Sequence, residues 1–596
     1  MSLLEDHELN DEQRVAITTA GDVLVVACPG SGKTRTLTFK IAYQLTQLQS
    51  EKQFIVAITY THRAADQIHE RIERLGIDTS QLWIGTIHSF CLEWILKPYF
   101  LYHPNLRYGF RVIDSHDKEA LLTQLCESYA GITYWDCEFY FTPKGRILGC
   151  SDERKHEALH EIVGKYLDEL VRRRQIDFEL VLLYAYQLLS ANPPIGIMLS
   201  NLFSHVLIDE YQDTKEIQYA IVAAILKAGA GKTAFFMVGD PNQAIFESLG
   251  GYAIEPEIFE RMANVKLQQL PLSLNYRSSQ KIVDYFRYFQ ISPGDIHAES
   301  KERTYPSLIT YDTSTAKDSI EDELVRLIRY NIETLGISPK EVCVIAPWWM
   351  HLASVTRKLA ARMPQYNFDG PGTVPFARDI DNFWYKLSKI VLTEPSPSLY
   401  TSRLRWAKEV LRELGVAGID VSEITPKLFL RNCNAIQIAE SDGLAYLHAF
   451  FTKLCAWLGV DLSATPHLQE HHDAFFQSSQ ARIQRLLNEG SQGIDNIASF
   501  RRVFASKSGI TVSTAHGVKG AEYDTVIAYA VLEGMIPHFT DSNGSESARK
   551  LLYVICSRAR KSLHLISETG RARGRRGTYT PTQELLGYAY RYDTVP

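Results

Sequence analysis

Residues 22–34 read DVLVVACPGSGKT, and the segment that follows them, RTLTFKIAYQL, has the apolar spacing of a helix. The opening run of β-branched apolar residues is typical of a strand, so the stretch predicts a strand, a tight turn and a helix in succession. At such a junction the backbone N–H groups of a small-residue turn and of the helix N-terminus face one position, which suits a phosphate. The stretch therefore predicts an α/β fold with a phosphate-binding loop.

The polar residues of this loop have separate expected roles. Lys33 neutralises the β- and γ-phosphate oxygens of a nucleotide, while the hydroxyl of Thr34 holds Mg²⁺. Small residues let the backbone approach closely, and Ala27 replaces the glycine with which the usual pattern begins. The expected nucleotide-binding residues of the loop are Pro29, Gly30, Ser31, Gly32, Lys33, Thr34 and Arg35.

A second Gly-Lys-Thr sequence, in residues 228–234 (AGAGKTA), lacks this context. It follows an apolar helical stretch, IQYAIVAAILK, and leads directly into the predicted strand AFFMVGD. We therefore expect a helix C-terminus and a turn there, and not a second phosphate site.

Two carboxylates follow another apolar strand, in residues 205–214 (HVLIDEYQDT). Asp209 is expected to meet the Mg²⁺ that Thr34 holds, and Glu210 to take a proton from the attacking water as general base. A third apolar strand ends in the loop VGDPNQ, where Gln243 is an uncharged group that orients the water or senses the γ-phosphate.

The order of these segments resembles that of superfamily 1A DNA helicases of the UvrD/Rep/PcrA kind. The resemblance extends over nearly the whole chain and rests on LNDEQRVAI (9–17), ACPGSGKT (27–34), TYTHRAADQI (59–68), GTIHSFC (85–91), LIDEYQDT (207–214), VGDPNQAIF (238–246), SLNYRSS (273–279), TVSTAHGVKGAEYDTVIA (511–528) and LLYVICSRARKSLHL (551–565).

The resemblance implies an α/β fold in which two RecA-like parallel-sheet motor domains hold ATP between them. It implies that Gln13 reads the adenine, that Tyr276 stacks on it, and that Glu522 belongs to the nucleotide-binding set. Arg277 is implied to reach the γ-phosphate, and Arg558 to be a second arginine finger. The implied DNA-contacting residues are Tyr60, Arg63, Thr86, His88, Phe246 and His516.

The chain departs from the family pattern in places. Ser248 and Leu249 stand where the family commonly has an aromatic residue and an arginine, so one base-stacking group is expected to be missing. Tyr60 and Phe246 have an alternative interpretation as core aromatics. Trp348 and its neighbour Trp349 are expected to be packing residues first and a DNA-facing wedge second.

The segment HEALH, at 156–160, matches the short pattern of zinc peptidases. Its surroundings, SDERKHEALHEIVGKYLDELVRRR, have the pattern of an amphipathic charged helix, and no third histidine follows. We therefore expect a solvated helix face there.

The resemblance also implies a domain plan. Residues 1–94 and 199–273 are expected to form motor domain 1A, with a helical insert, 1B, at 95–198. Motor domain 2A is expected at 274–378 and 506–596, with a short helical insert, 2B, at 379–505. No room is expected after Arg558 for the nuclease domain that some relatives carry.

Composition limits the class of protein. The 596 residues carry 63 Lys and Arg against 69 Asp and Glu, a net charge of −6, and 45% are hydrophobic, which excludes wholesale disorder. An acidic start and the lack of a long apolar run predict a cytoplasmic protein without a membrane partner. Nine cysteines without a C-x-x-C pair argue against a zinc cluster, and residues 549–596 are locally basic.

The expected function is that of an ATP- and Mg²⁺-dependent translocase on single-stranded DNA and a 3′–5′ helicase acting on tailed duplex DNA. Polarity follows only from the resemblance. An alternative from another class is an ATP-gated, DNA-end-sensing subunit beside a nuclease partner, in DNA repair or anti-phage defence, with little unwinding alone.

Overall fold

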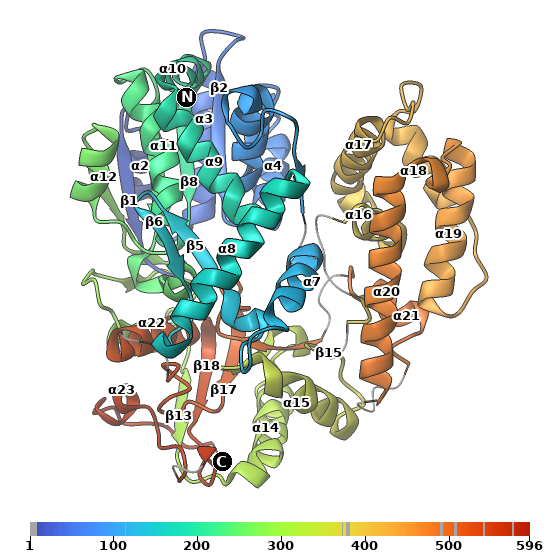
Figure 1. The fold of residues 1–596 in the computed structure, drawn as a ribbon. Helices are drawn as coiled ribbons and strands as arrows, with labels where there is room; N and C mark the ends of the chain where they lie inside the picture. The colour runs from blue at the N-terminus through green and yellow to red at the C-terminus, as the bar shows by residue number, and fades with distance from the viewer. Residues whose placement is uncertain are drawn as a thin grey trace. The chain divides into compact units, whose positions relative to one another are not determined.

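In a computed structural model, contacts divide the chain into two compact units (Figure 1). Unit 1 comprises residues 1–306 and 537–557, and unit 2 comprises residues 307–536 and 558–596. The structure describes residues 9–113, 115–371, 374–376, 382–488, 493–505, 509–539, 541, 543–574 and 577–595. Each unit contains a six-stranded sheet in which every pairing is parallel.

The sheet of unit 1 has the strand order β10-β1-β9-β8-β2-β3. Its strands are β1 (Val23–Ala27), β2 (Phe54–Thr59), β3 (Leu82–Thr86), β8 (Phe203–Asp209), β9 (Ala234–Gly239) and β10 (Gln268–Leu272). The connections contain α3 (Lys33–Gln47), α4 (His62–Arg74), α11 (Glu216–Gly229) and α12 (Pro256–Ala263). Because the strands are parallel, their carboxyl ends meet at one edge, where the loops after β1, β8 and β9 come together.

Both faces of the central strands β2, β8 and β9 are largely buried, which explains their nearly continuous apolar runs. On one face, Leu37 of α3 and Ile68 of α4 pack with Val25 of β1, together with Ala16 of α2 (Asp11–Thr18). The other face belongs to a larger core that continues into the insert after β3.

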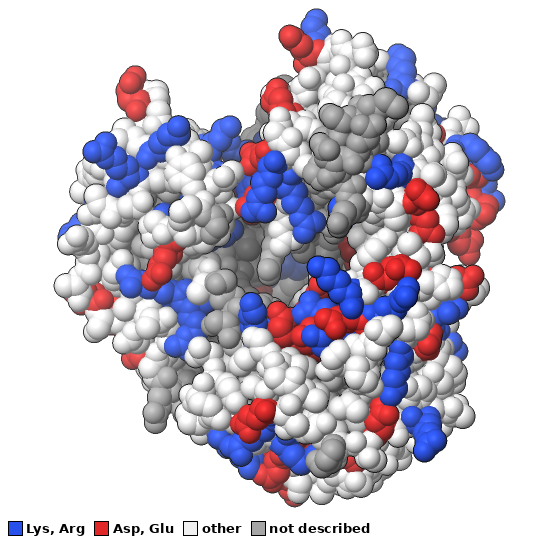
Figure 2. Space-filling model, turned by 180° about the vertical axis from the view of Figure 1, so that it is seen from behind, with Lys and Arg blue, Asp and Glu red and all other residues white. Residues whose placement is uncertain are grey.

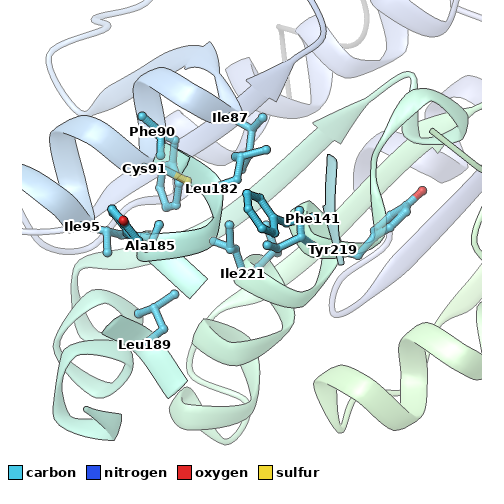
Figure 3. Close-up of a cluster of buried hydrophobic side chains, with 14 of the residues drawn as sticks. Ile87, Phe90, Cys91, Ile95, Phe141, Leu182, Ala185, Leu189, Tyr219 and Ile221 are labelled. Carbon is cyan, nitrogen blue, oxygen red and sulfur yellow. The ribbon is translucent and has the colours of Figure 1, made fainter. Parts of the chain in front are cut away.

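Figure 3 shows how the insert joins this larger core. The side chains that follow β3 meet those of α9 (Phe178–Ala191), of α11 and of β5 (Phe139–Thr142). The labelled members are Ile87, Phe90, Cys91, Ile95, Phe141, Leu182, Ala185, Leu189, Tyr219 and Ile221. The insert is therefore packed onto the sheet as part of unit 1.

The insert is mainly helical, as expected, and it also contains short strands that were not predicted. Besides α7 (Ser115–Cys126), α8 (His156–Arg173), α9 and α10 (Pro193–Leu202), it contains an antiparallel hairpin of β5 and β6 (Gly145–Leu148). Burial alternates along β5, because Phe139 and Phe141 face the core while their neighbours are half-buried. This two-residue period is short enough to be hidden among helical patterns.

The sheet of unit 2 has the order β13-β18-β17-β14-β16-β15. Its strands are β13 (Leu308–Asp312), β14 (Val342–Ala346), β15 (Phe368–Asp369), β16 (Ile510–Thr514), β17 (Tyr523–Ala528) and β18 (Ala559–Ile566). Its core also takes in side chains of α14 (Ile320–Arg329) and α15 (Trp349–Arg362). Trp348 packs against this core, as expected, while the side chain of Trp349 lies outside the described part.

A second helical insert has a core of its own. Its helices are α16 (Phe383–Leu392), α17 (Tyr400–Val416), α18 (Pro426–Ala435), α19 (Gly443–Leu458), α20 (Pro466–Asn488) and α21 (Ile497–Arg502). The predicted bounds at 378/379 and at 506 fall outside the described residues. The contact division leaves residues 274–306 and 537–557 in unit 1, whereas the sequence analysis assigns them to the second motor domain, so those domain bounds stay a prediction.

Both misleading motifs have the structure expected of them. Helix α11 ends at Gly229, Ala230 is left-handed with φ +48°, and β9 begins at Ala234, so AGAGKT is a helix end and a turn. In HEALH, Leu159 of α8 is buried and His160 is exposed, while the ring of His156 hydrogen-bonds the carbonyl of Cys150 at 2.7 Å. Within the described ranges, no three His, Cys, Asp or Glu side chains form a group suited to a metal ion.

A membrane-spanning helix is also not found in the part of the chain that the structure describes: no single helix is long and apolar enough. Among the helices that the structure describes, one pair, α9 and α10, matches together on length and composition, and the pair is bent by 101° at its junction.

Candidate nucleotide-binding and DNA-contacting site

The loop after β1 has the shape that a phosphate-binding loop needs. Gly30 and Gly32 have φ of +70° and +83°, in the left-handed region that favours glycine. A Cβ on Gly30 would lie 2.6 Å from the Cβ of Arg277, and one on Gly32 would lie 2.8 Å from Nε2 of Gln13. The two glycines therefore let Arg277 and Gln13 approach the loop from both sides.

The two residues expected at the adenine lie beside this loop. Nε2 of Gln13 donates to the carbonyl of Ser31 at 2.9 Å, and Asn10 caps α2 in a reciprocal bond with Gln13. Nδ2 of Asn10 donates to the hydroxyl of Tyr276 at 2.7 Å, and the Tyr276 side chain is exposed. The structure thus brings Gln13 and Tyr276 together next to the loop, and Asn10 joins them.

Two acidic side chains lie at the carboxyl end of β8. Burial, with the neighbouring charge of Glu210, raises the pKa of Asp209 well above its ordinary value, although Lys33 acts in the opposite direction. Burial likewise raises the pKa of Asp240, which follows β9, and Lys33 again opposes the shift. Lys33 is therefore the shared counter-charge of two buried carboxyl groups.

The donor set at this edge fits a magnesium ion. Asp209 offers carboxylate oxygens, and Thr34, in the first turn of α3, offers a hydroxyl, and oxygen donors of these kinds are what Mg²⁺ prefers. A divalent cation would also favour the ionised form of the buried Asp209.

A chain of hydrogen bonds joins the two acidic loops. Gln212 donates from Nε2 to Oε2 of Glu210 at 2.6 Å, and its Oε1 accepts from the backbone N–H of Asp240 at 3.0 Å. Oδ2 of Asp240 then accepts from Nε2 of Gln243 at 2.7 Å. The predicted base and the predicted γ-phosphate sensor are therefore held by one buried polar network, in which Gln212 was not predicted.

The predicted arginines fall in different units. Arg277, in unit 1, is half-buried and donates from Nη1 to the carbonyl of Ser557 at 3.0 Å. Arg558, in unit 2, is buried and donates to the carbonyl of Ala521 at 3.4 Å. Within the same unit, Glu522 is exposed and pairs with Arg560 at 3.2 Å.

Two predicted DNA-contacting aromatics from separate motifs lie against each other. The rings of Tyr60 and Phe246 are stacked, with centroids 5.3 Å apart and an interplanar angle of 28°. Tyr60 is 47% exposed, so its alternative interpretation as a core residue is wrong. The pair offers a stacking surface of the kind that single-stranded nucleic acids use.

The other predicted DNA-contacting residues differ in their surroundings. Thr86 caps the short helix α5 (Ile87–Phe90) by accepting from the N–H of Ser89 at 3.3 Å. His88 packs edge-on against Phe178, and burial lowers its pKa to about 4, so it is a neutral imidazole near pH 7. His516 is exposed in unit 2.

The side chains of Arg63 and Ser248 lie outside the described residues. Phe178 was not predicted, and its only sequence signal is its place directly after Asp177, which caps α9.

The basic segment at 549–596 is divided between the two units. Several of its cations are paired, as in Lys550 with Glu247 at 2.5 Å and Arg560 with Asp524 at 2.6 Å. Positive and negative side chains are interspersed on the face shown in Figure 2. The ion pairs therefore offset part of the local excess of positive charge in residues 549–596.

Comparisons with known proteins bear on the family of this chain. Residues 9–253 match the UvrD/REP helicase N-terminal domain, and residues 470–570 match the UvrD-like helicase C-terminal domain. The ATP-dependent DNA helicase PcrA of Leuconostoc citreum is 23% identical over 94% of this chain and 82% of its own length. PcrA of Bacillus subtilis is 22% identical over 97% of this chain and 85% of its own length.

A third relative matches more closely over a shorter stretch. DNA helicase II of Haemophilus influenzae is 31% identical over 46% of this chain, which corresponds to 39% of that protein. Because both family models match in the expected order, and the PcrA alignments extend over nearly all of the residues, the chain belongs to the UvrD/Rep/PcrA-like superfamily 1A helicases.

Proposed function

We propose that this chain is an ATP-dependent translocase on single-stranded DNA and a 3′–5′ DNA helicase, which hydrolyses ATP between two RecA-like motor domains. The observation that carries the proposal is the assembly, at one edge of a parallel sheet, of the Lys33 loop with the Asp209–Glu210 pair. Gln13, Tyr276 and Arg277 lie against the same loop.

In this proposal the loop residues bind the triphosphate. The loop N–H groups and Lys33 contact the phosphate oxygens, and Gly32 permits the close approach. Asp209 and Thr34 would hold Mg²⁺, which neutralises charge on the β- and γ-phosphates when it is bound. Tyr276 offers its exposed ring to the adenine.

Hydrolysis then depends on a small number of polar groups. Glu210 accepts a proton from the attacking water, and Gln243, oriented by Asp240, senses the γ-phosphate. Arg277 and Arg558 supply positive charge to the transition state, which is worth on the order of 10³-fold in related phosphoryl-transfer reactions. When phosphate leaves, the attraction between its charge and the two arginines is lost, and the motor domains move apart. If both motor domains hold the same DNA strand, this movement produces translocation.

The DNA contacts assigned here act without base specificity. Tyr60 and Phe246 provide the stacking surface, which contributes about 1–3 kcal/mol for each stacked base. The neutral His88 offers a hydrogen bond and no charge to a phosphate. The 3′–5′ polarity is inferred from the family and not from any of these side chains.

The test is the rate of ATP hydrolysis by the purified full-length chain with and without single-stranded DNA. We expect hydrolysis that needs Mg²⁺, rises on addition of the DNA, and is lost in Lys33→Ala. A chain that binds ATP but hydrolyses it at the same slow rate with and without DNA would contradict the proposal. No comparison, and no feature of the described residues, favours the alternative of an end-sensing subunit beside a nuclease.

A further inference from the structure

Helix α22 (Gly544–Cys556) comes late in the sequence but belongs to unit 1. It packs against α13 (Gln280–Arg287) and against the Pro241–Gln243 turn that follows β9. On its outer side, Nη2 of Arg549 donates to the carbonyls of Tyr288 and Gln290 at 2.7 and 2.8 Å. The helix is therefore fixed beside the loop that carries Gln243.

Tyr553 lies at the centre of this packing. Its side chain is fully buried, and its ring meets Phe286 of α13 edge-on, with centroids 5.4 Å apart. Its hydroxyl donates to Oδ2 of Asp240 at 3.3 Å, and the same oxygen accepts from Nε2 of Gln243 at 2.7 Å. One carboxylate oxygen thus joins α22 to the side chain assigned as the γ-phosphate sensor.

Asp240 is itself held from several directions. Its Oδ1 accepts from the N–H of Asn242 at 3.0 Å, and its own N–H donates to Gln212, which also binds Glu210. The carboxyl group is buried, and polar groups in such an environment affect one another more strongly than they do in water. A change in the hydrogen bonding of Gln243 will therefore alter the hydrogen bond between Asp240 and the Tyr553 hydroxyl.

The other end of α22 leads to the two arginines. The helix ends at Cys556, and the carbonyl of the next residue, Ser557, accepts from Nη1 of Arg277 at 3.0 Å. The residue after that is Arg558, the first residue of the second unit in this part of the chain. Tyr553 thus precedes Arg558 by little more than one helical turn.

A second tie connects α22 to the same loop. Nζ of Lys550, which is buried, pairs with Oε1 of Glu247 at 2.5 Å and with Glu546 of its own helix at 2.6 Å. Together, Lys550 and Tyr553 hold one face of α22 against the segment from Asp240 to Glu247.

We propose that Tyr553 is a positioning residue for hydrolysis, whose hydroxyl ties the helix that leads into Arg558 to the carboxylate that orients Gln243. The inference rests on the proposed function, because it uses the roles given there to Gln243 and Arg558. When the γ-phosphate is present, Gln243 is held by both the phosphate and Asp240. When the γ-phosphate leaves, the contact between Gln243 and Asp240 is altered. This change shifts the position of α22 and of Ser557 and Arg558, which follow it.

The test uses Tyr553→Phe in the full-length chain, which keeps the ring and removes the hydroxyl. We expect DNA-stimulated kcat to fall about 10- to 150-fold, the range for loss of one hydrogen bond to a charged group. The KM for ATP should stay within about twofold, because nothing that touches the nucleotide has been removed.

The chain offers a matched control in Tyr166→Phe. Tyr166 is also buried, and its hydroxyl donates to Oδ2 of Asp177 at 3.0 Å, within the insert and outside the nucleotide site. The two variants remove the same kind of hydrogen bond, so their melting temperatures should fall by similar amounts. Only Tyr553→Phe should lose kcat, and an equal loss in both variants would mean a merely structural role.

Two further variants separate the remaining outcomes. In an Asp240→Asn background, Tyr553→Phe should change kcat less than twofold, and a full additional loss would overturn the link through Asp240. If Tyr553→Phe does not fold, Lys550→Met cuts the second tie to the loop and should lower kcat with the KM kept, so an unchanged kcat overturns the inference. Absence of DNA-stimulated hydrolysis in the unaltered chain would instead overturn the proposed function.

Discussion

At the scale of single residues, Glu210 is the side chain whose chemistry matters most to the proposal. It has φ +50°, follows the buried Asp209 and accepts from Gln212. Glu210→Gln keeps the shape but removes the basic oxygen, so kcat should fall by about 10²-fold or more, as for loss of a general base. Nucleotide affinity should change little.

Single-turnover hydrolysis and equilibrium nucleotide binding, measured on the same preparation, check this prediction. Glu157→Gln is the control, because Glu157 is an exposed glutamate of the HEALH segment. It should leave hydrolysis unchanged. Normal turnover in Glu210→Gln would remove Glu210 from its role as base.

The stacked pair Tyr60 and Phe246 gives a second prediction at this scale. Tyr60→Ala should weaken binding of a single-stranded oligonucleotide by about 5- to 150-fold, from the loss of roughly 1–3 kcal/mol of stacking. Because the rings touch, the double variant with Phe246→Ala should lose less than the sum of the two single losses. Fluorescence anisotropy at fixed salt measures both.

Tyr400→Ala is the matched control for this pair. Tyr400 is 49% exposed, close to the 47% of Tyr60, and it begins α17 of the second helical insert. Its replacement should leave affinity for the short single strand unchanged. Equal losses in Tyr60→Ala and Tyr400→Ala would show that the stacked pair has no special part in binding.

Sequence alone places those site residues whose position is fixed by local geometry, while the roles given to them stay predictions. Lys33 and Thr34 follow from a strand, turn and helix, and Asp209 and Glu210 follow from the end of a buried strand. Tyr553 could not be assigned a function in this way, because its contact with Asp240 joins residues more than 300 positions apart. Nothing in the local sequence distinguishes such a tyrosine from an ordinary core residue.

At the scale of elements, the turn from β1 into α3 depends on backbone freedom. Gly32→Ala adds a Cβ at φ +83°, which costs about 1–2 kcal/mol, and places it 2.8 Å from Nε2 of Gln13. We expect lower stability and weaker ATP binding. In the helical control Gly164→Ala, the added Cβ meets nothing within 4 Å, so stability should rise by about 0.5–1 kcal/mol.

Thermal unfolding and nucleotide titration of the two glycine variants check this contrast. If Gly32→Ala bound ATP as well as the unaltered chain, the loop would not need the left-handed conformation that the structure shows.

Strand β18 carries a buried histidine that should make unit 2 sensitive to acid. Burial, with Arg326 nearby, lowers the pKa of His564 from 6.5 to about 3, and its ring contacts Thr310 at 2.8 Å and Asn331 at 3.0 Å. Below pH 6.5 the imidazole of His564 therefore binds a proton in the unfolded chain but not in the folded chain. Stability is lost as pH falls from about 6.5 towards 3, by up to about 1.4 kcal/mol for each pH unit.

Urea unfolding at pH 7 and pH 5 measures this effect. His564→Gln removes the titrating group, so its loss of stability between the two pH values should be smaller by about 2 kcal/mol. An identical pH dependence in both proteins would mean that His564 has the same pKa in the folded and the unfolded chain, which would contradict the burial effect.

The elements differ in how well the sequence predicts them. Long buried strands such as β1, β8 and β9 stand out because both faces are apolar. The β5–β6 hairpin was missed, since each strand has only four residues and lies between helical patterns. Short elements depend on the surface they pack against, here the core under α9 and α11, more than on their own sequence.

At the scale of the whole molecule, the sequence predicted two parallel-sheet units with helical inserts, and the structure has them. Contacts reveal that α22 belongs to unit 1 while the next strand, β18, belongs to unit 2. A linear domain plan cannot show such an exchange, because it follows from packing and not from composition. The chain passes from unit 1 to unit 2 between Ser557 and Arg558. In the proposed function, this is the segment through which ATP hydrolysis moves one motor domain relative to the other.

The most direct test of this account is strand displacement from duplexes with a 3′ or a 5′ single-stranded tail, at equal enzyme and ATP. We predict that the chain displaces the strand only from the 3′-tailed duplex, and that Glu210→Gln abolishes displacement while ATP binding is kept. Displacement from the 5′-tailed duplex alone would contradict the polarity. Displacement by Glu210→Gln at the unaltered rate would contradict the claim that hydrolysis drives the movement.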